Sequence, residues 1–267
     1  STQHNLDILR SYGNHIIEPA AGELASHLIG KGRMEEPEKI IEVLEQFFAS
    51  RQDLQGRKVV ITAGPTYEKI DPVRFIGNYS SGKMGYALAE ECAERGAEVT
   101  LISGPVSLNP VHPNIHRISV ESAAQMHQTA ISSFSSADAG ILCAAVADFT
   151  PEECSNQKIK RGEDDLVIRL KPTHDIASEL GKMKTENQRL VGFALETNDE
   201  IAHAQSKLER KNLDFIVMNS LNDAGAGFRC DTNKISIIDA QGITSYSLKP
   251  KKEVAKDIVD KLVSLFR

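Results

Sequence analysis

The sequence predicts an α/β protein in which a mostly parallel sheet is covered by helices on both faces. From residue 58 onward, short apolar runs that suit buried strands alternate with amphipathic segments that suit helices, and repeated strand–helix–strand units build parallel sheets. Near the C-terminus the runs KISIID and ITSYSL are joined through Gln241 and Gly242. This pattern is typical of a hairpin and predicts an antiparallel strand near one edge.

The strands are expected where apolar residues run without interruption. KVVITA is the first of them, and a continuous apolar run of this length indicates a strand that is buried on both faces. The expected strands cover 58–63, 97–103, 137–145, 165–170, 189–195 and 213–219, followed by the hairpin.

The helices are expected between the strands, and capping residues mark several of their ends. Ser122 with Gln125, and Thr197 with Glu200, have the spacing of capping boxes, and Thr173 is the expected cap of the segment THDIASELGKM. Gly96 suits the end of the second helix. The expected helices cover 37–49, where Pro37 occupies the first position, and 83–95, 123–134, 173–183, 200–211 and 253–266.

A polar linker, RQDLQGRK at 51–58, marks a domain boundary. Residues 1–50 are too few for an independent domain, so the expected division is a short N-terminal segment, 1–50, and a main domain, 51–267. Most domains of this size bury a sizeable core.

Composition excludes several classes of protein. The net charge of −6 disfavours a nucleic-acid partner, and no apolar run approaches the ~18 residues of a membrane span. The first residues, STQHNLDILRS, lack the apolar core of a signal peptide, which indicates a cytoplasmic protein. Four cysteines without a C-x-x-C pair indicate reduced thiols. The eight histidines show no ligand spacing, and Pro113 disfavours a helix through His112 and His116, so no metal site is expected.

Ligands of such sheets bind at the carboxyl ends of the strands, which points to the loops 64–82, 144–160, 171–176 and 193–199. Loop 64–82 ends in NYSSGKMG, which places glycine, serine and backbone N–H groups at a helix N-terminus. This is an anion site by its chemistry. The alternative is that the glycines serve only the turns of a long loop.

Two familiar phosphate motifs fail in this loop. GNYSSGKM at 77–84 fits G-x-x-x-x-G-K, but Met84 stands where Ser or Thr would hold Mg²⁺. A dinucleotide fingerprint is missing after the first strand, and Ser103 stands where an acid would bind a ribose. The interpretations as a P-loop ATPase and as an NAD(P)-dependent oxidoreductase are therefore weak, and the oxidoreductase is kept as the alternative.

Single residues near the strand ends have both functional and structural interpretations. Asp148 suits a ribose hydroxyl or a metal, or simply a turn. Cys143 suits a buried strand position better than a nucleophile. Phe193 suits stacking on a base, or core packing. Lys207 and Lys211 share a helix face, where they suit an anion or the helix dipole.

Lys158, Lys160 and Arg161 form a cationic run in NQKIKRGEDD. Cations near a phosphate loop neutralise charge that develops in phosphoryl or nucleotidyl transfer. The alternative is a solvated loop.

Several longer motifs together resemble bacterial phosphopantothenoylcysteine synthetase. They are GPTYEKIDPVRFIGNYSSGKMG, AAVADF, KIKR, VGFALET and RKNLDFIVMN, in this order, and the match runs from about Gly56 to the C-terminus. Residues 1–50 resemble the tail of the phosphopantothenoylcysteine decarboxylase that precedes this ligase in many bacterial polypeptides. GELASHLIGKGRMEEP resembles its substrate-covering flap, with Ser26 where many members have Cys. Decarboxylase activity is not expected of this chain, since the rest of that domain is not part of it.

The resemblance implies a Rossmann-like three-layer sandwich, a homodimer and a two-step ligase reaction of coenzyme A biosynthesis. The carboxylate of 4′-phosphopantothenate would attack the α-phosphate of CTP, with Mg²⁺ on the triphosphate and release of pyrophosphate. The amine of L-cysteine would then attack the acyl-cytidylate and release CMP.

The resemblance also implies roles for particular residues. Asn78 would contact the pantothenoyl part and the acyl carbonyl, and Lys158 would meet the phosphates during activation. Many members have Pro in place of His174. The residues implied for nucleotide binding are Leu142, Cys143, Ala144, Asp148, Lys158, His174, Asp175, Ile176, Ala177, Phe193, Lys207 and Lys211.

Overall fold

The computed structural model describes residues 1–23, 29–49, 52–162, 165–196, 200–220 and 230–266. The chain divides into two units, Ser1–Asp53 and Leu54–Arg267. Each unit is described by itself below. The assignment of the first unit to a decarboxylase remnant stays a prediction.

The first unit contains two helices and a hairpin. Helix α2 (Pro37–Ala49) confirms the expected helix over these residues. Helix α1 (Thr2–Ser11) and the antiparallel strands β1 (Ala20–Glu23) and β2 (Ile29–Arg33) were not predicted. The rings of His15 and Phe47 meet edge to face at 4.4 Å, which ties the segment before the hairpin to α2. The flap resemblance and Ser26 fall partly or wholly outside the described residues.

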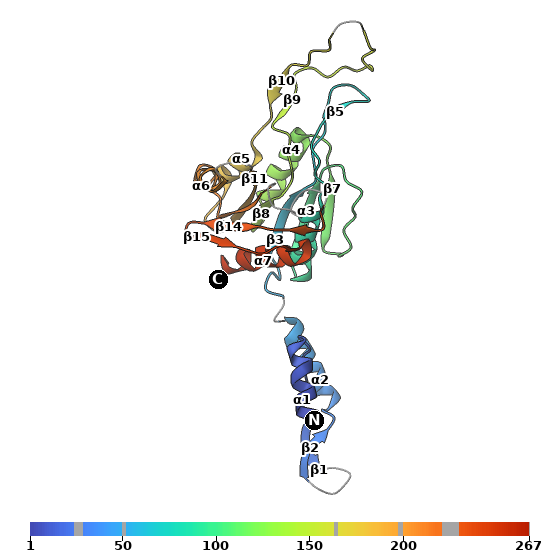
Figure 1. Ribbon diagram of the computed structural model, residues 1–267, viewed down its shortest axis with the longest axis vertical. Helices are drawn as coiled ribbons and strands as arrows, with labels where there is room; N and C mark the ends of the chain where they lie inside the picture. Colours follow the sequence, from blue (N-terminus) through green and yellow to red (C-terminus); the bar gives the residue numbers. More distant parts are fainter. Residues whose placement is uncertain (24–28, 50–51, 163–164, 197–199, 221–229, 267) are drawn as a thin grey trace. The chain divides into compact units, whose positions relative to one another are not determined.

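The second unit is built on an eight-stranded sheet of order β15-β14-β12-β11-β8-β3-β6-β7 (Figure 1). The six strands from β7 to β12 are parallel, and β14 and β15 are antiparallel to their neighbours at one edge. The expected α/β class, with its antiparallel strands near one edge, is confirmed. The strands are β3 (Lys58–Ala63), β6 (Glu98–Ser103), β7 (Ile115–Ser119), β8 (Ala139–Leu142), β11 (Arg189–Glu196), β12 (Phe215–Ser220), β14 (Ser236–Asp239) and β15 (Gly242–Ser245).

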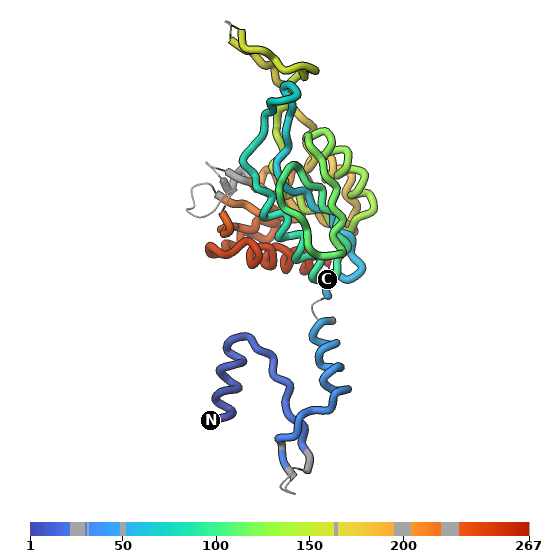
Figure 2. The backbone as a smooth tube through the Cα atoms, turned by 90° about the vertical axis from the view of Figure 1, so that its right-hand side faces the viewer, coloured from blue at the N-terminus to red at the C-terminus, as the bar shows by residue number. Residues whose placement is uncertain are grey.

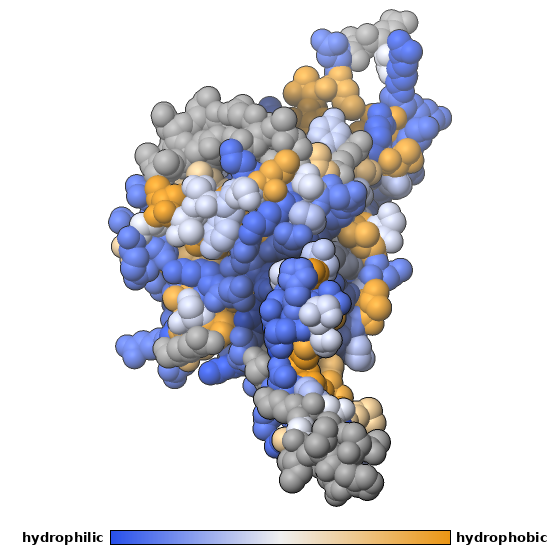
Figure 3. All heavy atoms as spheres, turned by 60° about the horizontal axis from the view of Figure 1, so that its bottom comes forward, coloured by the Kyte–Doolittle hydropathy of each residue, from blue (hydrophilic) through white to orange (hydrophobic). Residues whose placement is uncertain are grey.

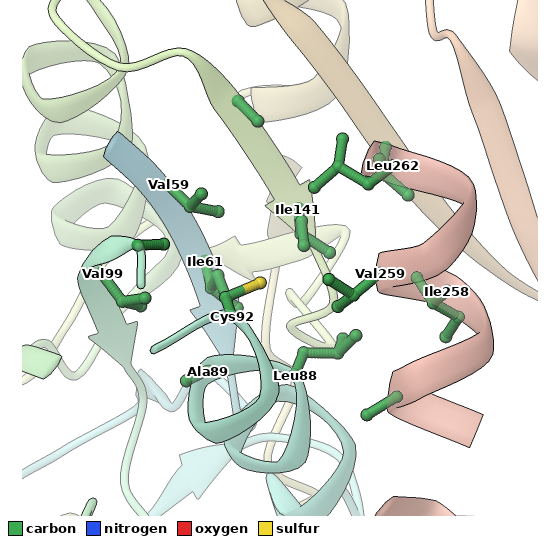
Figure 4. Packing of buried hydrophobic residues seen from close by; sticks show 14 of the residues in the cluster. Val59, Ile61, Leu88, Ala89, Cys92, Val99, Ile141, Ile258, Val259 and Leu262 are labelled. Atoms are coloured by element: carbon green, nitrogen blue, oxygen red, sulfur yellow. The ribbon is translucent and has the colours of Figure 1, made fainter. Parts of the chain in front are cut away.

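Helices cover both faces of this sheet, so the unit has two hydrophobic cores. Helices α3 (Lys83–Glu94) and α7 (Lys251–Ser264) pack on one face, and Figure 4 shows Leu88 and Val259 beside Ile141 of β8. Helices α4 (Ala123–Phe134), α5 (Ile176–Met183) and α6 (Glu200–Arg210) pack on the other face. Successive β3 side chains point to opposite faces, which explains why KVVITA is apolar without alternation.

Two long connections extend from the carboxyl-end edge of the sheet and lie side by side (Figures 1 and 2). The loop predicted over 64–82 contains a small hairpin, β4 (Glu68–Lys69) and β5 (Phe75–Ile76). The second connection carries β9 (Phe149–Pro151) and β10 (Leu170–Pro172), which pair antiparallel. The backbone N–H of Ser155 donates to Ile70 O at 3.0 Å and joins the two connections. Strands β13 (Thr232–Asn233) and β16 (Lys249–Pro250) form a further short pair.

Several expected elements differ in the structure. The prediction of a strand over 165–170 is wrong. Only Leu170 lies in a strand, and Val167 is 81% exposed, so this apolar run does not reach the core. The predicted third strand, 137–145, ends at Leu142. Cys143 N still donates to Thr62 O at 3.2 Å, whereas Ala144 N donates to the side-chain Oγ1 of Thr62 at 3.2 Å.

The capping predictions had mixed outcomes. The Ser122–Gln125 capping box is present at the start of α4. The prediction that Thr173 caps α5 is wrong. The Thr173 hydroxyl donates to Ala147 O at 2.7 Å, and Asp175 caps the helix instead by accepting from Ser178 N at 3.0 Å. The expected box at Thr197 lies outside the described residues.

Among the described residues, no helix is long and apolar enough to cross a membrane. The face shown in Figure 3 is mainly hydrophilic, with hydrophobic residues in scattered patches.

Candidate anion-binding site

Two adjoining pockets lie at the carboxyl ends of β3, β8 and β11. Pocket A has a volume of about 300 Å³ and begins at the N-terminus of α3, and pocket B, of about 480 Å³, extends toward the N-terminus of α5. They have lining residues in common, which makes them two halves of one cleft, called here the double pocket. The shared residues are Ala144, Val146, Asp148, Phe193 and Lys207.

The N-terminus of α3 forms one wall of pocket A. Its cap residue, Gly82, has a φ of 75°, and no side chain caps the helix. Residues 80–85 all line the pocket, so N–H groups of the first turn border the cavity. Gly85 lets the helix approach the sheet, because a Cβ there would lie 2.5 Å from Ala63 Cβ. An exposed first turn with a cavity in front of it favours an anion.

Lysines surround this helix end. Lys83, Lys207 and Lys251 line pocket A, where Asp148 is the one carboxylate among the described lining residues. Lys83 Nζ lies 2.6 Å from Asp231 Oδ1. Lys251 is only 7% exposed, and its Nζ donates to Thr232 O at 3.1 Å and also to Cys230 O. Burial lowers the pKa of Lys251. The excess of cations over carboxylates makes pocket A electropositive.

Pocket B has a more mixed lining. Lys211 Nζ pairs with Asp175 at 3.0 Å, and this pairing together with the Ser178 N–H keeps the pKa of Asp175 below its ordinary value although desolvation opposes it. Phe149, Phe193 and His174 supply ring faces to the same pocket. This half therefore suits an uncharged or amphipathic group next to the anion in pocket A.

The thiol of Cys143 lines pocket A. Burial raises its pKa to about 12, so the group is a protonated thiol at neutral pH. It serves as a small wall residue rather than as a nucleophile.

Most residues proposed from the motif resemblance lie at the double pocket, and their roles stay predictions. Those that line it are Leu142, Cys143, Ala144, Asp148, His174, Asp175, Ile176, Ala177, Phe193, Lys207 and Lys211.

Asn78 is near the double pocket without lining it. Its Nδ2 donates to Ala145 O at 2.5 Å and its Oδ1 accepts from Ser80 N at 3.1 Å. The side chain thus links loop 64–82 to the end of β8. In this conformation it holds the pocket wall, and its catalytic role stays a prediction.

Lys158 lies on the exposed connection between β9 and β10 and lines neither half of the double pocket. Its neighbour Ile159 is anchored, because Arg74 Nη2 donates to Ile159 O at 2.6 Å and Ile159 N donates to Asp71 Oδ2 at 3.1 Å. The Arg74 guanidinium and several N–H groups hold the pKa of the buried Asp71 carboxyl far below its usual range. Lys160 and Arg161 are likewise exposed.

Sequence reasoning missed four polar residues of pocket A. Lys83 belongs to the GK pair that failed the P-loop test, and Lys251 lies in the KPKK run, as the first residue of α7. Asn219 lies in β12 and Asn233 in β13. A signal existed only for Lys83, through its place at the helix N-terminus. The others are brought to the site by the order of the strands.

Comparisons with known proteins place this chain among proteins of pantothenate metabolism. The family model described as "DNA/pantothenate metabolism flavoprotein C-terminal domain" matches residues 54–265. A "Cysteine/Cysteine sulfinic acid decarboxylase" from an unknown prokaryotic organism is 58% identical, over 99% of this chain and 75% of that protein. The "Coenzyme A biosynthesis bifunctional protein CoaBC" of Haemophilus influenzae is 46% identical, over 100% of this chain and 66% of that protein.

Solved structures agree on the fold. The crystal structure of the C-terminal domain of a CoaBC protein is 41% identical, with a TM-score of 0.69, and the match covers 80% of this chain and 97% of that one. A DNA/pantothenate metabolism flavoprotein from Streptococcus pneumoniae, 24% identical with a TM-score of 0.69, supports the fold alone.

These comparisons contradict the activity inferred from the motifs. The family description names a flavoprotein, and the 58% identical relative is named a decarboxylase; no ligase or CTP is named. The identification as a phosphopantothenoylcysteine synthetase, the ligase reaction, a nucleotide ligand, and CTP with Mg²⁺ are therefore not retained. The NAD(P)-dependent oxidoreductase has no support either. The physical reason is that one fold hosts several chemistries, so motifs shared by a family do not fix its reaction. The link to coenzyme A biosynthesis remains.

Proposed function

Because this chain belongs to the family of the DNA/pantothenate metabolism flavoprotein C-terminal domain, we propose that it is part of a decarboxylating enzyme of coenzyme A biosynthesis and that its double pocket binds that enzyme's phosphorylated, pantothenate-derived substrate. The chain spans 75% of the decarboxylase relative and 66% of the bifunctional one, so the reaction is proposed of the whole polypeptide. A cytoplasmic location and a homodimer stay predictions within this proposal.

One observation carries the binding proposal: the uncapped N-terminus of α3 and three lysines border the same cavity. Backbone N–H groups, the helix dipole and lysine ammonium groups together are the usual chemistry of phosphate binding. The phosphate would lie in pocket A, and the pantothenoyl arm, with its amides and alkyl carbons, would extend into pocket B past Phe193.

The family description implies a flavin, and its fit to the double pocket can be tested by size. Pockets of about 300 and 480 Å³ are each at the lower end of the range for one drug-sized molecule. One extended phosphorylated substrate suits two joined pockets of this size, which leaves little room for a tricyclic flavin beside it. We therefore assign no flavin to this cleft and derive no step through one.

The charges of the cleft agree with a binding role rather than with the decarboxylation step. Loss of CO₂ requires that the carboxylate give up its negative charge, and lysines beside a carboxylate stabilise the ground state instead. Held by its phosphate, the substrate gains binding energy far from the reacting carboxyl. Such remote binding energy can be used to position the reacting group.

Isothermal titration calorimetry on the full chain tests this proposal. 4′-Phosphopantothenate and phosphopantothenoylcysteine should bind, and pantothenate without phosphate should bind at least tenfold more weakly, since hydrogen bonds to charged groups contribute about 1.5–3 kcal/mol. Lys207→Gln should cause a loss of similar size. Lys252→Gln is the matched control, because Lys252 is 77% exposed on α7 and does not line the cleft.

Equal affinity for phosphorylated and unphosphorylated pantothenate would refute the proposed phosphate site. Two further ligands sharpen the test. FMN is expected not to bind this cleft. Saturable binding of CTP with Mg²⁺ that is lost in Lys207→Gln would contradict the proposed occupant of the cleft.

A further inference from the structure

Three side chains from two separate stretches of the sequence meet where His174 lines pocket B. His127 lies on α4, Glu179 in the first turn of α5, and His174 in the connection that leads from β10 into α5. His127 Nε2 lies 2.7 Å from Glu179 Oε2, and His174 Nδ1 lies 3.4 Å from Glu179 Oε1. The two imidazole rings are stacked at 4.7 Å with an interplanar angle of 19°.

From this arrangement we propose that His127, His174 and Glu179 form a binding site for a divalent transition-metal ion, with Zn²⁺ as the best fit. All three candidate ligand atoms lie within 4.8 Å of one another. In a tetrahedral zinc site with bonds of about 2.0–2.1 Å, ligand atoms are about 3.3 Å apart. Shifts of the side-chain ends by about an ångström would bring the three atoms to such distances, with no change in the backbone.

The type of ligand determines the type of metal. Imidazole nitrogens suit Zn²⁺, Ni²⁺, Co²⁺ and Cu²⁺, whereas Mg²⁺ and Ca²⁺ prefer oxygen ligands only. Two histidines and one carboxylate are also the ligand set of zinc sites that keep an open position. Here the fourth position is accessible, because His174 is 69% exposed while His127 is only 18% exposed.

The carboxylate is ready to act as a ligand at neutral pH. A hydrogen bond from the His127 ring lowers the pKa of Glu179, with a smaller contribution from His174. Both imidazoles must be unprotonated to bind a metal.

An ion at this site would connect the helices to the cleft. It would join α4 to α5 and fix His174, which lines pocket B. The open coordination position would lie at the pocket rim, where a water molecule or an oxygen of the pocket's ligand can fill it. The site does not depend on the proposed function, because it uses only the three side chains and their positions.

The test is metal titration of the full chain, purified without a histidine tag and stripped with chelator. Zn²⁺, Ni²⁺ and Co²⁺ should each bind with one-to-one stoichiometry by calorimetry, and Mg²⁺ should not. The single variants His127→Ala, His174→Ala and Glu179→Gln should each weaken Zn²⁺ binding at least tenfold. His112→Ala and His116→Ala are the matched controls and should leave it unchanged.

A competing explanation is zinc binding at a free thiol, such as the exposed Cys154. The Co²⁺ complex distinguishes the two, because a thiolate ligand gives a strong near-ultraviolet charge-transfer band and a site of two histidines and a carboxylate does not. Unchanged Zn²⁺ affinity in the His127→Ala/His174→Ala double variant, or its loss in Cys154→Ser, would overturn the proposal. A zinc-edge anomalous peak between the three side chains would support it.

The two proposals fail separately. A chain that binds Zn²⁺ but not phosphopantothenate would retain this site and lose the proposed function, and the reverse result would retain the function alone. Circular dichroism of each variant confirms that it is folded before it is titrated.

Discussion

The close approach of α3 to β3 allows a quantitative prediction for Gly85→Ala. A Cβ at residue 85 would lie 2.5 Å from Ala63 Cβ and 3.1 Å from Ala63 Cα. Both atoms belong to the buried core or the backbone of a central strand, so neither can move aside as a flexible side chain could. Extra atoms forced into a packed core cost about 1–3 kcal/mol.

The substitution also has a favourable part. Alanine has a higher helix propensity than glycine, by about 1 kcal/mol in a helix interior. Since residue 85 lies in the first turn, where this gain is smaller, the expected net loss in the free energy of unfolding is about 1–2 kcal/mol. The substitution should also weaken phosphate binding, because displacement of α3 moves its N–H groups relative to Lys207.

Urea unfolding followed by far-ultraviolet circular dichroism measures this loss, since the chain has no tryptophan. A double-mutant cycle with Ala63→Gly isolates the contact, because the second substitution removes the atom that the new Cβ meets. The double variant should recover about 1 kcal/mol or more of the loss relative to the sum of the single effects. A Gly85→Ala protein that is as stable as the parent, or a cycle with no coupling, would show that the helix does not pack this closely.

Further predictions concern the anchored loop and the thiols. The pKa of Asp71 is depressed in the folded protein, so its contribution to stability is present above the ordinary carboxyl pKa of about 3.9 and is lost as the pH falls toward the folded-state value. Asp71→Asn should therefore lower the Tm at pH 7 and flatten the dependence of Tm on pH between about 4 and 2. Thermal melts measure this trend, and a slope equal to that of the parent protein would refute it. The same variant should expose the loop around Ile159 to faster cleavage by trypsin, because the anchor on both its backbone groups is lost; an unchanged digestion pattern would contradict this. The exposed Cys154 should react with a disulfide reagent at pH 8 well before Cys143, because burial raises the pKa of the Cys143 thiol to about 12. Mass spectrometry of the labelled peptides gives the order of reaction, and labelling of Cys143 first would show that its thiol is not buried.

The sheet was predictable because its signal is local. KVVITA is apolar except at Lys58 and Thr62, with no alternation between its two faces, and such a run is typical of a strand covered on both faces. The Ser122–Gln125 box was readable for the same reason, since both partners lie within one helical turn. β7 was missed because its sequence, IHRIS, is polar at several positions, and only pairing with β6 defines it.

Elements whose conformation depends on distant contacts were predicted less well. LVIRL has the composition of a strand, yet only Leu170 pairs, with Pro151 of β9, and the residues before it lie in an exposed connection. Thr173 has the chemistry of a cap, but the Ala147 carbonyl takes its hydroxyl and Asp175 takes the cap position. In both cases a local preference was outweighed by a contact that is not local in the sequence.

The same distinction applies to the sites. The rule that ligands lie at strand ends led to the residues after β8 and β11, because strand ends are visible in the sequence. It could not lead to Lys251, which reaches pocket A through the return of the chain at β16. The histidine spacing gave no sign of a metal site, because His127 and His174 belong to different elements that only the packing of α4 on α5 brings together.

The charges in the cleft constrain which chemistry can take place there. Three lysines and a helix N-terminus at pocket A stabilise whatever anion enters it. A phosphate gains from this throughout the reaction, since its charge does not change, whereas a carboxylate about to lose CO₂ would be held in its ground state. If the whole enzyme decarboxylates, the reacting carboxyl must therefore lie away from these lysines while the phosphate remains among them. Neutralising Lys207 should then raise KM for the phosphorylated substrate more than it lowers kcat, and a selective fall in kcat would place the chemistry inside the cleft instead.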